Sequence, residues 1–282
     1  MNNLTQYSKI NDVLSAALSI NLSIVQGSGI GPTLYVLMES DLHPLSLFNV
    51  LVKFADDTNL IVPEHTDCEL TVEFEHIRQW SADNNMVINL DKTKEIVFQR
   101  PHPSKFDMPE ELDSIDRVRV AKLLGVIIPF NFNFDEHVSY ILSICSQRLY
   151  LLKLLRSQGL PSKQLSEVFV AIVLSRLTYA LSAWGGFVNQ SQKTRINVFL
   201  RRARRFGFVS LDYDICELLA TADFKLFKNI VNHNHCLYHL LPPLHNNFKV
   251  LRPRGHKYQL PNCRYKLFKD SYLPRCLYQF RF

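Results

Sequence analysis

The stretch that most constrains the fold is Lys53–Pro63, KFADDTNLIVP, in which two adjacent aspartates stand between apolar runs. The flanking runs, Leu47–Phe54 and Leu60–Val62, suit strands, and Asp-Asp-Thr-Asn between them supplies turn chemistry. The pattern predicts a hairpin that presents Asp56 and Asp57 as a pair at the edge of a sheet. Two like charges this close favour a bound cation, and carboxylate oxygens select a hard one such as Mg²⁺. A solvated turn without a ligand is the simpler interpretation of the dipeptide alone.

Three further blocks accompany this pair, and the four follow one another as VQGSGIGP at Val25–Pro32, FADD at Phe54–Asp57, INLDKTK at Ile88–Lys94 and LLGV at Leu123–Val126. In this order they resemble the blocks of non-LTR, or LINE-type, retrotransposon reverse transcriptases. The resemblance continues to the tail at Ser271–Arg275, so it covers nearly the whole chain. Four ordered blocks are far more specific than any one of them. Val25 is a departure, because the family usually has proline at that position.

The resemblance implies an RNA-directed DNA polymerase that extends a primer by two-metal nucleotidyl transfer. Its partners would be an RNA template, a DNA primer and deoxynucleoside triphosphates, and its cofactor would be Mg²⁺ or Mn²⁺. Asp56 and Asp57 would hold the metal, and Lys94 would reach the triphosphate or protonate the leaving pyrophosphate. From the residues alone, Lys94 is equally a solvated lysine in a hairpin formed by Met86–Leu90 and Glu95–Phe98.

The resemblance also implies four residues at the border of the incoming nucleotide and the template: Gln26, Gly27, Phe54 and Ala55. The glycine block is not a dinucleotide fingerprint, because Pro32 falls where the third glycine would stand, and it has no Gly-Lys-Ser/Thr of a phosphate loop. Taken alone, it is a tight turn that leads into a helix predicted over Thr33–Leu45, with Pro32 in its first turn.

A further catalytic aspartate of the resembled family lies on a strand well upstream of the glycine block. Only twenty-five residues precede Gln26, and their only acid, Asp12, falls in a predicted turn. We therefore expect a reverse transcriptase fragment that lacks the first catalytic carboxylate and is inactive alone, with an upstream fingers and palm segment of the same element as a further partner. The alternative is a catalytically dead nucleic-acid-binding protein. A metal-dependent nuclease would need a third acid converging on Asp56.

Charge divides the chain into two unlike halves. Residues 1–140 hold ten Lys/Arg and twenty Asp/Glu, whereas residues 141–282 hold twenty-two Lys/Arg and six Asp/Glu. The acidic half suits metal binding, and the basic half suits a polyanion such as a nucleic acid, whose phosphates dominate affinity. A basic surface without a partner is the alternative, because net charge also serves solubility.

Three helical patterns follow Asp135, at Ile141–Ser157, Ser162–Trp184 and Thr194–Phe206. The third carries a cluster of basic residues beside apolar ones: Arg201, Arg202, Arg204 and Arg205. One face of this helix can therefore pack while the other meets phosphates, although a solvated basic face would have the same pattern.

These patterns predict an α+β fold in three regions. Residues 1–128 would form a partial reverse-transcriptase palm, mainly an antiparallel sheet with helices. Residues 129–210 would form a helical, basic, thumb-like region, and residues 211–282 a helical C-terminal lobe in which basic and aromatic residues alternate. Within the first region, a capping box at Thr66–Glu69 predicts a helix start, and Val120–Ile128 is predicted as one apolar strand.

The remaining signals concern compartment and metals. Six cysteines without CxxC spacing suit reduced thiols of an intracellular protein, nuclear or cytoplasmic. No apolar run is expected to cross a membrane, and the N-terminus lacks the features of a signal peptide. His233, His235, Cys236 and His239 lack zinc-finger spacing, so we predict that they lie on a helix over Ile230–Leu241. The aromatic residues of the basic tail could stack on bases or pack a lobe.

Overall fold

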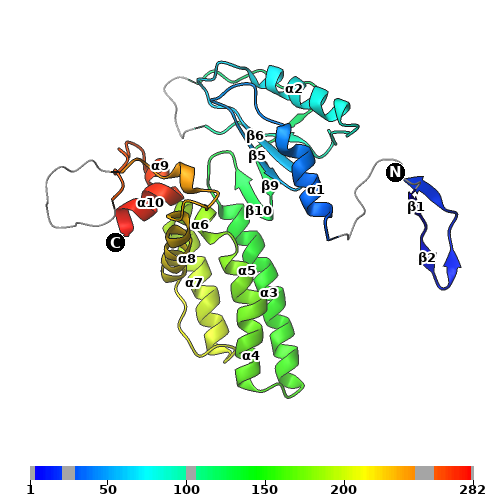
Figure 1. The fold of residues 1–282 in the computed structure, drawn as a ribbon. Coiled ribbons are helices and arrows are strands. Elements are labelled where there is room, and N and C mark those ends of the chain that lie inside the picture. The colour runs from blue at the N-terminus through cyan, green and yellow to red at the C-terminus, as the bar shows by residue number, and fades with distance from the viewer. Residues whose placement is uncertain (1–3, 21–28, 100–105, 245–256, 281–282) are drawn as a thin grey trace. The chain divides into compact units, whose positions relative to one another are not determined.

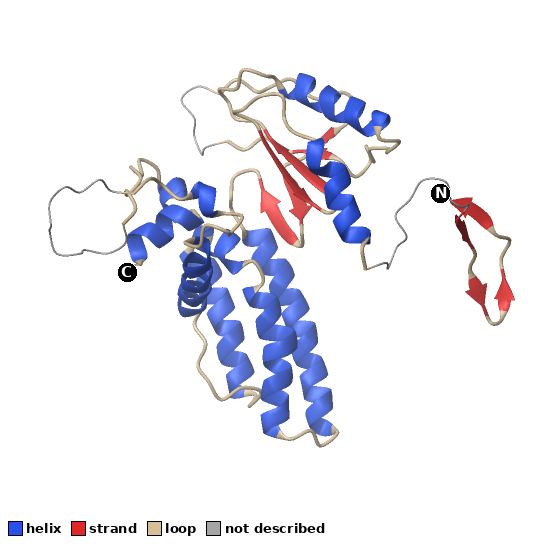
Figure 2. Cartoon of the chain, viewed as in Figure 1, coloured by secondary structure: helices blue, strands red, loops and turns tan. Residues whose placement is uncertain are grey.

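A computed structural model describes residues 4–20, 29–99, 106–244 and 257–280. Two compact units divide the chain: the first is Met1–Glu95 with Glu110–Asp116, and the second is Ile96–Pro109 with Arg117–Phe282. Helices and two-stranded sheets are both present, which confirms the α+β class (Figures 1 and 2). The borders at residues 128 and 210 and the palm and thumb assignment stay predictions.

The first unit begins with a two-stranded ribbon. Strand β1 (Leu4–Gln6) pairs antiparallel with β4 (Leu18–Ile20), and β2 (Lys9–Ile10) pairs with β3 (Val13–Leu14). The turn between β2 and β3 is Asn11-Asp12, and both residues have positive φ, 48° and 64°. Asn and Asp tolerate this conformation better than most side chains, which is why the predicted turn forms at this point.

A second hairpin follows helix α1 (Gly31–Met38) and the 3-10 turn η1 (Glu39–Asp41). It joins β5 (Val50–Phe54) to β6 (Asp57–Ile61), with Phe54 opposite Asp57 and Val50 opposite Ile61. Helix α2 (Leu70–Asp83) comes next, and β7 (Lys94–Glu95) pairs with β8 (Asp116–Arg117). The helix predicted over Thr33–Leu45 therefore ends sooner, at Met38. Strand β7, which carries Lys94, pairs with β8 and not with Met86–Leu90 as predicted.

The predicted capping box at Thr66–Glu69 is wrong. Helix α2 has Glu69 as its N-cap without a side-chain hydrogen bond. The Thr66 hydroxyl instead donates to Asn49 Oδ1 at 2.7 Å and accepts from the Cys68 amide at 3.2 Å. Thr66 thus serves the preceding loop, because a tertiary partner competes with the local cap.

The second unit opens with a hairpin where one strand was predicted. Strands β9 (Val120–Leu123) and β10 (Val126–Pro129) pair antiparallel around Leu124-Gly125, whose φ values are 45° and 86°. Gly125 adopts this left-handed conformation without strain. An apolar run of nine residues therefore contains a reversal that hydrophobicity alone did not predict.

Helices make up most of the second unit, in the order α3 (Asp135–Ser157), α4 (Ser162–Phe169), the π-helical η2 (Val170–Leu174), α5 (Ser175–Thr178), α6 (Leu181–Trp184), η3 (Gly185–Phe187), α7 (Gln190–Arg205), α8 (Ile215–Ile230), η4 (Tyr238–Leu240), α9 (Lys266–Asp270) and α10 (Tyr272–Gln279). The helix predicted over Ser162–Trp184 is interrupted after Thr178, where Ala180 has a φ of 50°. The helix predicted over Ile230–Leu241 is also wrong, because α8 ends at Ile230 and only a 3-10 turn follows.

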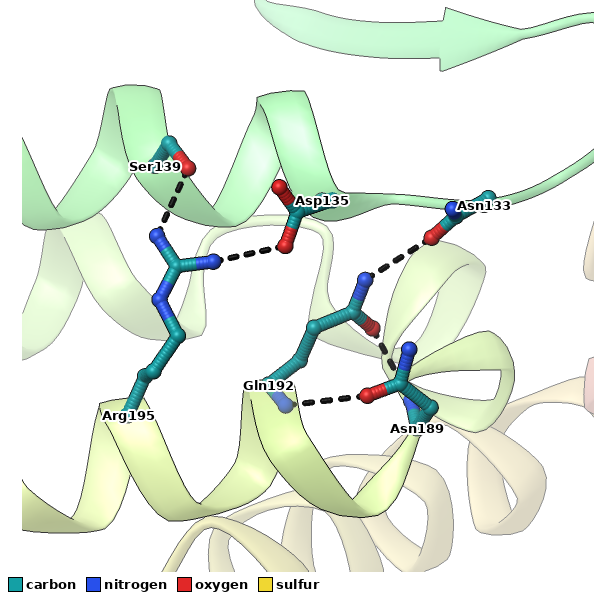
Figure 3. A network of polar contacts seen from close by, with 6 residues as sticks. All are labelled: Asn133, Asp135, Ser139, Asn189, Gln192 and Arg195. Carbon is teal, nitrogen blue, oxygen red and sulfur yellow. Dashed lines mark hydrogen bonds and ion pairs between the residues drawn. The ribbon is translucent and has the colours of Figure 1, made fainter.

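One polar network joins the starts of α3 and α7 (Figure 3). Asn189 and Gln192 form a reciprocal capping box at α7, with bonds of 2.9 and 3.0 Å, and Gln192 Nε2 donates to Asn133 Oδ1 at 2.9 Å. Arg195 then donates to Asp135 Oδ1 at 2.6 Å and to Ser139 Oγ at 2.7 Å. The side chain of Gln192 is buried yet satisfied, so the network fixes how these two helices meet.

By length and composition, two helical segments of the second unit, Asp135–Ser157 and Ser162–Phe187, could cross a membrane, which corrects the expectation that no run is long enough. Both segments supply fully buried residues, such as Leu152 and Phe169, to one hydrophobic core. Packing therefore uses part of their apolar composition, since 28% of the most apolar stretch of the first segment and 44% of that of the second are buried.

The C-terminal helix α10 is attached by a buried ion pair. Arg275 Nε and Nη2 donate to the two carboxylate oxygens of Asp223 on α8, at 2.7 and 3.0 Å, and Nη2 also donates to the Ser182 carbonyl at 2.9 Å. Asp223 is fully buried, so the bidentate geometry compensates for its desolvation. Gly186 lies against this pair, because a Cβ there would stand 1.7 Å from Arg275 Nη1.

Candidate functional site

The two aspartates lie at the tip of the β5–β6 hairpin. Ala55 and Asp56 form a two-residue loop, with φ of 51° at Ala55, and Asp57 is the first residue of β6. Both carboxylates are exposed, as the sequence predicted. The turn is shorter than expected, because Thr58 and Asn59 pair with β5 as strand residues. Phe54 precedes the loop.

Asp56 acts electrostatically on helix α1. The Tyr35 hydroxyl donates to Glu39 Oε1 at 2.7 Å. Burial raises the pKa of Tyr35 most, followed by this hydrogen bond and the charges of Glu39 and Asp56. The hairpin tip thus lies within electrostatic range of Tyr35 and adds to a negative environment. Lys53 is used elsewhere: its ammonium donates to the Leu42 carbonyl at 3.0 Å and to the Glu39 carbonyl.

A buried carboxylate, Glu73, holds the loop before the hairpin. It accepts hydrogen bonds from the Leu45 amide at 2.9 Å, from the Ser46 amide at 2.8 Å and from Asn49 Nδ2 at 2.8 Å. Burial alone would raise the pKa of Glu73, but these donors together lower it. We missed this residue, although its place on the apolar side of α2, three residues after Leu70, was a signal.

The aspartate pair offers only part of a metal centre. Carboxylate oxygens suit Mg²⁺ and Mn²⁺ in chemistry. Among the residues that the structure describes, however, no group of three or more His, Cys, Asp or Glu could hold an ion. His233, His235, Cys236 and His239 all lie in the described part of the chain and do not form such a group, so a zinc site there has no structural support.

The other predicted catalytic and nucleotide-binding residues differ from one another in exposure and in partners. Lys94 forms an ion pair with Asp116, with 2.5 Å between Nζ and Oδ2, and its side chain is 31% exposed. Phe54 is 62% exposed. Gln26 and Gly27 lie outside the described residues, so the predicted nucleotide border is represented only by Phe54 and Ala55.

The four clustered arginines near the C-terminal end of α7 divide into two kinds. Arg201, Arg204 and Arg205 are exposed. Arg202 is half-buried, donates to Ser146 Oγ at 3.2 Å and lies 5.6 Å from the Phe199 ring centroid. Helical periodicity explains the division, because the intervening residue of the cluster, Ala203, is fully buried against the core.

The three exposed arginines line a surface hollow of about 410 Å³ together with Asp212. Arg204 and Arg205 lie in the last turn of α7, where the partial charges of the helix favour cations, and Arg201 directly precedes that turn. Asp212 forms an ion pair with Arg204. We call this site, made of Arg201, Arg204, Arg205 and Asp212, the arginine hollow.

Further cations of α3 lie around the turn that follows α7. The ammonium of Lys153 stands 4.5 Å from the Phe206 ring centroid, and the guanidinium of Arg156 stands 5.0 Å from that of Phe208. Arg156 also donates to the Phe206 carbonyl. Both cations are exposed, so this end of the second unit carries positive charge from two helices.

The described part of the basic, aromatic tail packs in part into a lobe, whereas its stacking on bases stays a prediction. Tyr258 and Tyr272 pack against a small core that contains Phe227 and Cys276. Phe268 and Tyr278 remain 47% and 44% exposed. A packed lobe therefore exists, with aromatic side chains left on its surface.

Comparison with known proteins gives two relatives, both from Drosophila melanogaster. The chain is 24% identical over 212 residues to the probable RNA-directed DNA polymerase from transposon BS. The aligned region covers 70% of this chain and 23% of that protein. It is 24% identical over 188 residues to the probable RNA-directed DNA polymerase from transposon X-element, with coverages of 63% and 21%. No family model matches, and no solved structure matches. The chain spans less than a quarter of the relatives it matches, and it is a distant homologue of transposon RNA-directed DNA polymerases.

Proposed function

We propose that the chain is part of a reverse transcriptase of the non-LTR retrotransposon type. Its partners would be an RNA template, a DNA primer and deoxynucleoside triphosphates. The observation that supports this most is the FADD block: its aspartates stand exposed at a hairpin tip in a chain whose relatives are named as RNA-directed DNA polymerases.

In this proposal, Asp56 and Asp57 are ligands of Mg²⁺ or Mn²⁺, which would supply charge stabilisation for phosphoryl transfer. Lys94 would serve as a proton donor only after it leaves Asp116, because the pair at 2.5 Å occupies its ammonium. Phe54 and Ala55, with Gln26 and Gly27, would border the incoming nucleotide.

We further propose that the chain alone does not polymerise. Two-metal chemistry uses carboxylates on both sides of the ions, whereas Asp56 and Asp57 come from one hairpin tip. Within the described residues β5 and β6 form a two-stranded sheet, so each has an unpaired edge, and Val52, Phe54 and Ile61 are 49%, 62% and 55% exposed. An upstream segment of the same element would pair with this hairpin and supply a third carboxylate.

Primer extension on poly(rA)/oligo(dT) with dTTP and Mg²⁺ tests both statements. We expect no extension by the chain alone and extension when the upstream segment is supplied. Asp56→Asn should abolish the extension that the upstream segment restores. Asp83→Asn, which changes an exposed acid at the end of α2, should not abolish it. Efficient extension by the chain alone, lost on Asp56→Asn, would contradict the need for a further carboxylate.

A second function, nucleic-acid binding without catalysis, is favoured by the arginine hollow. Three exposed arginines there are available to phosphates, which dominate nucleic-acid affinity. Labelled RNA–DNA hybrids titrated at several salt concentrations would measure this. Arg201→Ala and Arg205→Ala should each reduce the slope of log affinity against log salt by about 0.7–0.9.

Arg195→Gln is the matched control, because Arg195 lies on the same helix but is bound to Asp135 and Ser139. Its slope should equal that of the wild type. If binding is retained but no extension occurs with any upstream segment, the non-catalytic function is the correct one. If Arg201→Ala and Arg205→Ala leave the slope unchanged, the hollow is only a solvated basic face.

A further inference from the structure

The arginine hollow contains an acid in the most basic part of the chain. Residues 141–282 hold six acidic residues against twenty-two basic ones. Asp212 is one of those six, and it lines the hollow with Arg201, Arg204 and Arg205. An acid in such a place lowers the affinity of the hollow for anions, so its presence calls for a physical explanation.

Asp212 does not serve the local fold as its neighbour Asp214 does. Asp214 caps α8 by accepting from the Cys216 amide at 2.7 Å, and it accepts from Asn197 Nδ2 at 2.5 Å. Asp212 is 67% exposed in its side chain, and its ion pair is with Arg204, which is 51% exposed. The pair is thus open to water and to an incoming ligand.

A carboxylate and a phosphate present similar pairs of oxygens to a guanidinium. The carboxylate of Asp212 therefore stands where a phosphate oxygen would bind Arg204. Arg201 and Arg205 have no ion pair with any acid among the described residues. A ligand that binds the hollow meets two available arginines and one that already holds an anion.

We propose that Asp212 is a specificity-determining residue. Its carboxylate occupies Arg204, so a phosphodiester group binds Arg204 only after a nucleic acid has displaced Asp212. The inference rests on the proposed contact between the hollow and nucleic acid, and it names the selectivity of that site. The loss of the exposed Arg204–Asp212 pair opposes a single phosphate more than it opposes a strand, because the strand already contacts Arg201 and Arg205. The hollow thereby favours a polyanionic strand over free nucleotides or inorganic phosphate.

The test is a double-mutant cycle on the whole chain, with binding of a labelled RNA–DNA hybrid measured over a range of salt concentrations. Asp212→Asn keeps the shape of the side chain and removes its charge. It should tighten hybrid binding by about two- to fivefold, the range expected for an exposed ion pair. In this variant, inorganic phosphate should also displace the hybrid from the hollow at a lower concentration than in the wild type. Arg204→Ala should weaken binding more in the Asp212→Asn background than in the wild type.

Asp135→Asn is the matched control, because Asp135 forms a similarly exposed pair with Arg195, at the other end of α7. It should leave hybrid binding unchanged. Equal affinity of the wild type and Asp212→Asn, while Arg201→Ala and Arg205→Ala weaken binding, would overturn the role of Asp212 and leave nucleic-acid binding by the hollow in place. If Arg201→Ala and Arg205→Ala have no effect either, both the hollow's function and the role of Asp212 are refuted.

Discussion

Acid should destabilise the second unit through one buried histidine, His137. Its side chain is 1% exposed, and its ring lies 4.9 Å from that of Trp184, centroid to centroid. The Ile127 amide donates to Nδ1 at 3.2 Å, so the proton of the neutral ring sits on Nε2, which has no hydrogen-bond partner in the part of the chain that the structure describes. Burial, aided by the charge of Arg176, lowers the pKa of His137 from 6.5 to about 4.

The sign and the magnitude follow from this shift. Because the pKa is lower in the folded protein, the unfolded chain binds the proton more readily, and stability is lost as pH falls from 6.5 towards 4. A shift of roughly 2.5 pKa units corresponds to about 3 kcal/mol, at about 1.4 kcal/mol for each unit. Above pH 6.5 this contribution is fully present.

Urea unfolding between pH 7.5 and 4, followed by the fluorescence of Trp184, would measure the loss. The chain has two tryptophans, so Trp80→Phe in every variant isolates the signal. His137→Gln retains an acceptor for the Ile127 amide but does not titrate. Its free energy of unfolding should fall less between pH 6.5 and 4 than that of the wild type, by about 3 kcal/mol. The same pH dependence in both proteins would refute the reasoning.

Three further predictions concern packing and buried groups. Gly186→Ala should destabilise the second unit by roughly 2 kcal/mol or more, because its Cβ would collide with Arg275; the urea midpoint measures this. Glu73→Ala should cost about 3 kcal/mol, since it leaves two backbone amides without an acceptor and removes one of the two hydrogen bonds that Asn49 Nδ2 donates, whereas Glu75→Ala, at an exposed i,i+3 pair, should change the unfolding free energy by less than about 0.5 kcal/mol. Burial raises the pKa of the Cys276 thiol to about 12, so it should resist iodoacetamide until the protein is unfolded, as mass spectrometry would show.

Local patterns succeeded where a short stretch specifies its own conformation. Asn11-Asp12 favours a two-residue turn, and the turn is present. The apolar period of Ile141–Ser157 predicts a helix, and α3 extends over Asp135–Ser157. The hairpin around Asp56 and Asp57 belongs to the same class. In each case the residues that decide the structure are neighbours in the sequence, so no distant contact was needed.

Patterns failed where a distant partner or a backbone reversal decided the outcome. Thr66 has the sequence of a helix cap, yet its hydroxyl bonds Asn49, seventeen residues away. Val120–Ile128 reads as one strand, yet Leu124-Gly125 reverses the chain. The helix over Ser162–Trp184 is interrupted at Ala180 although no glycine or proline marks the site.

By itself the sequence determined the division of charge, the order of the four blocks and the hairpin that carries the aspartates, because these depend on composition and on neighbouring residues. Only the tertiary structure decided which charged groups are available. Arg202 packs against α3 while Arg201 and Arg205 stay exposed, and Arg204 is held by Asp212. Availability depends on burial and on partners far along the chain, and residue type does not encode either.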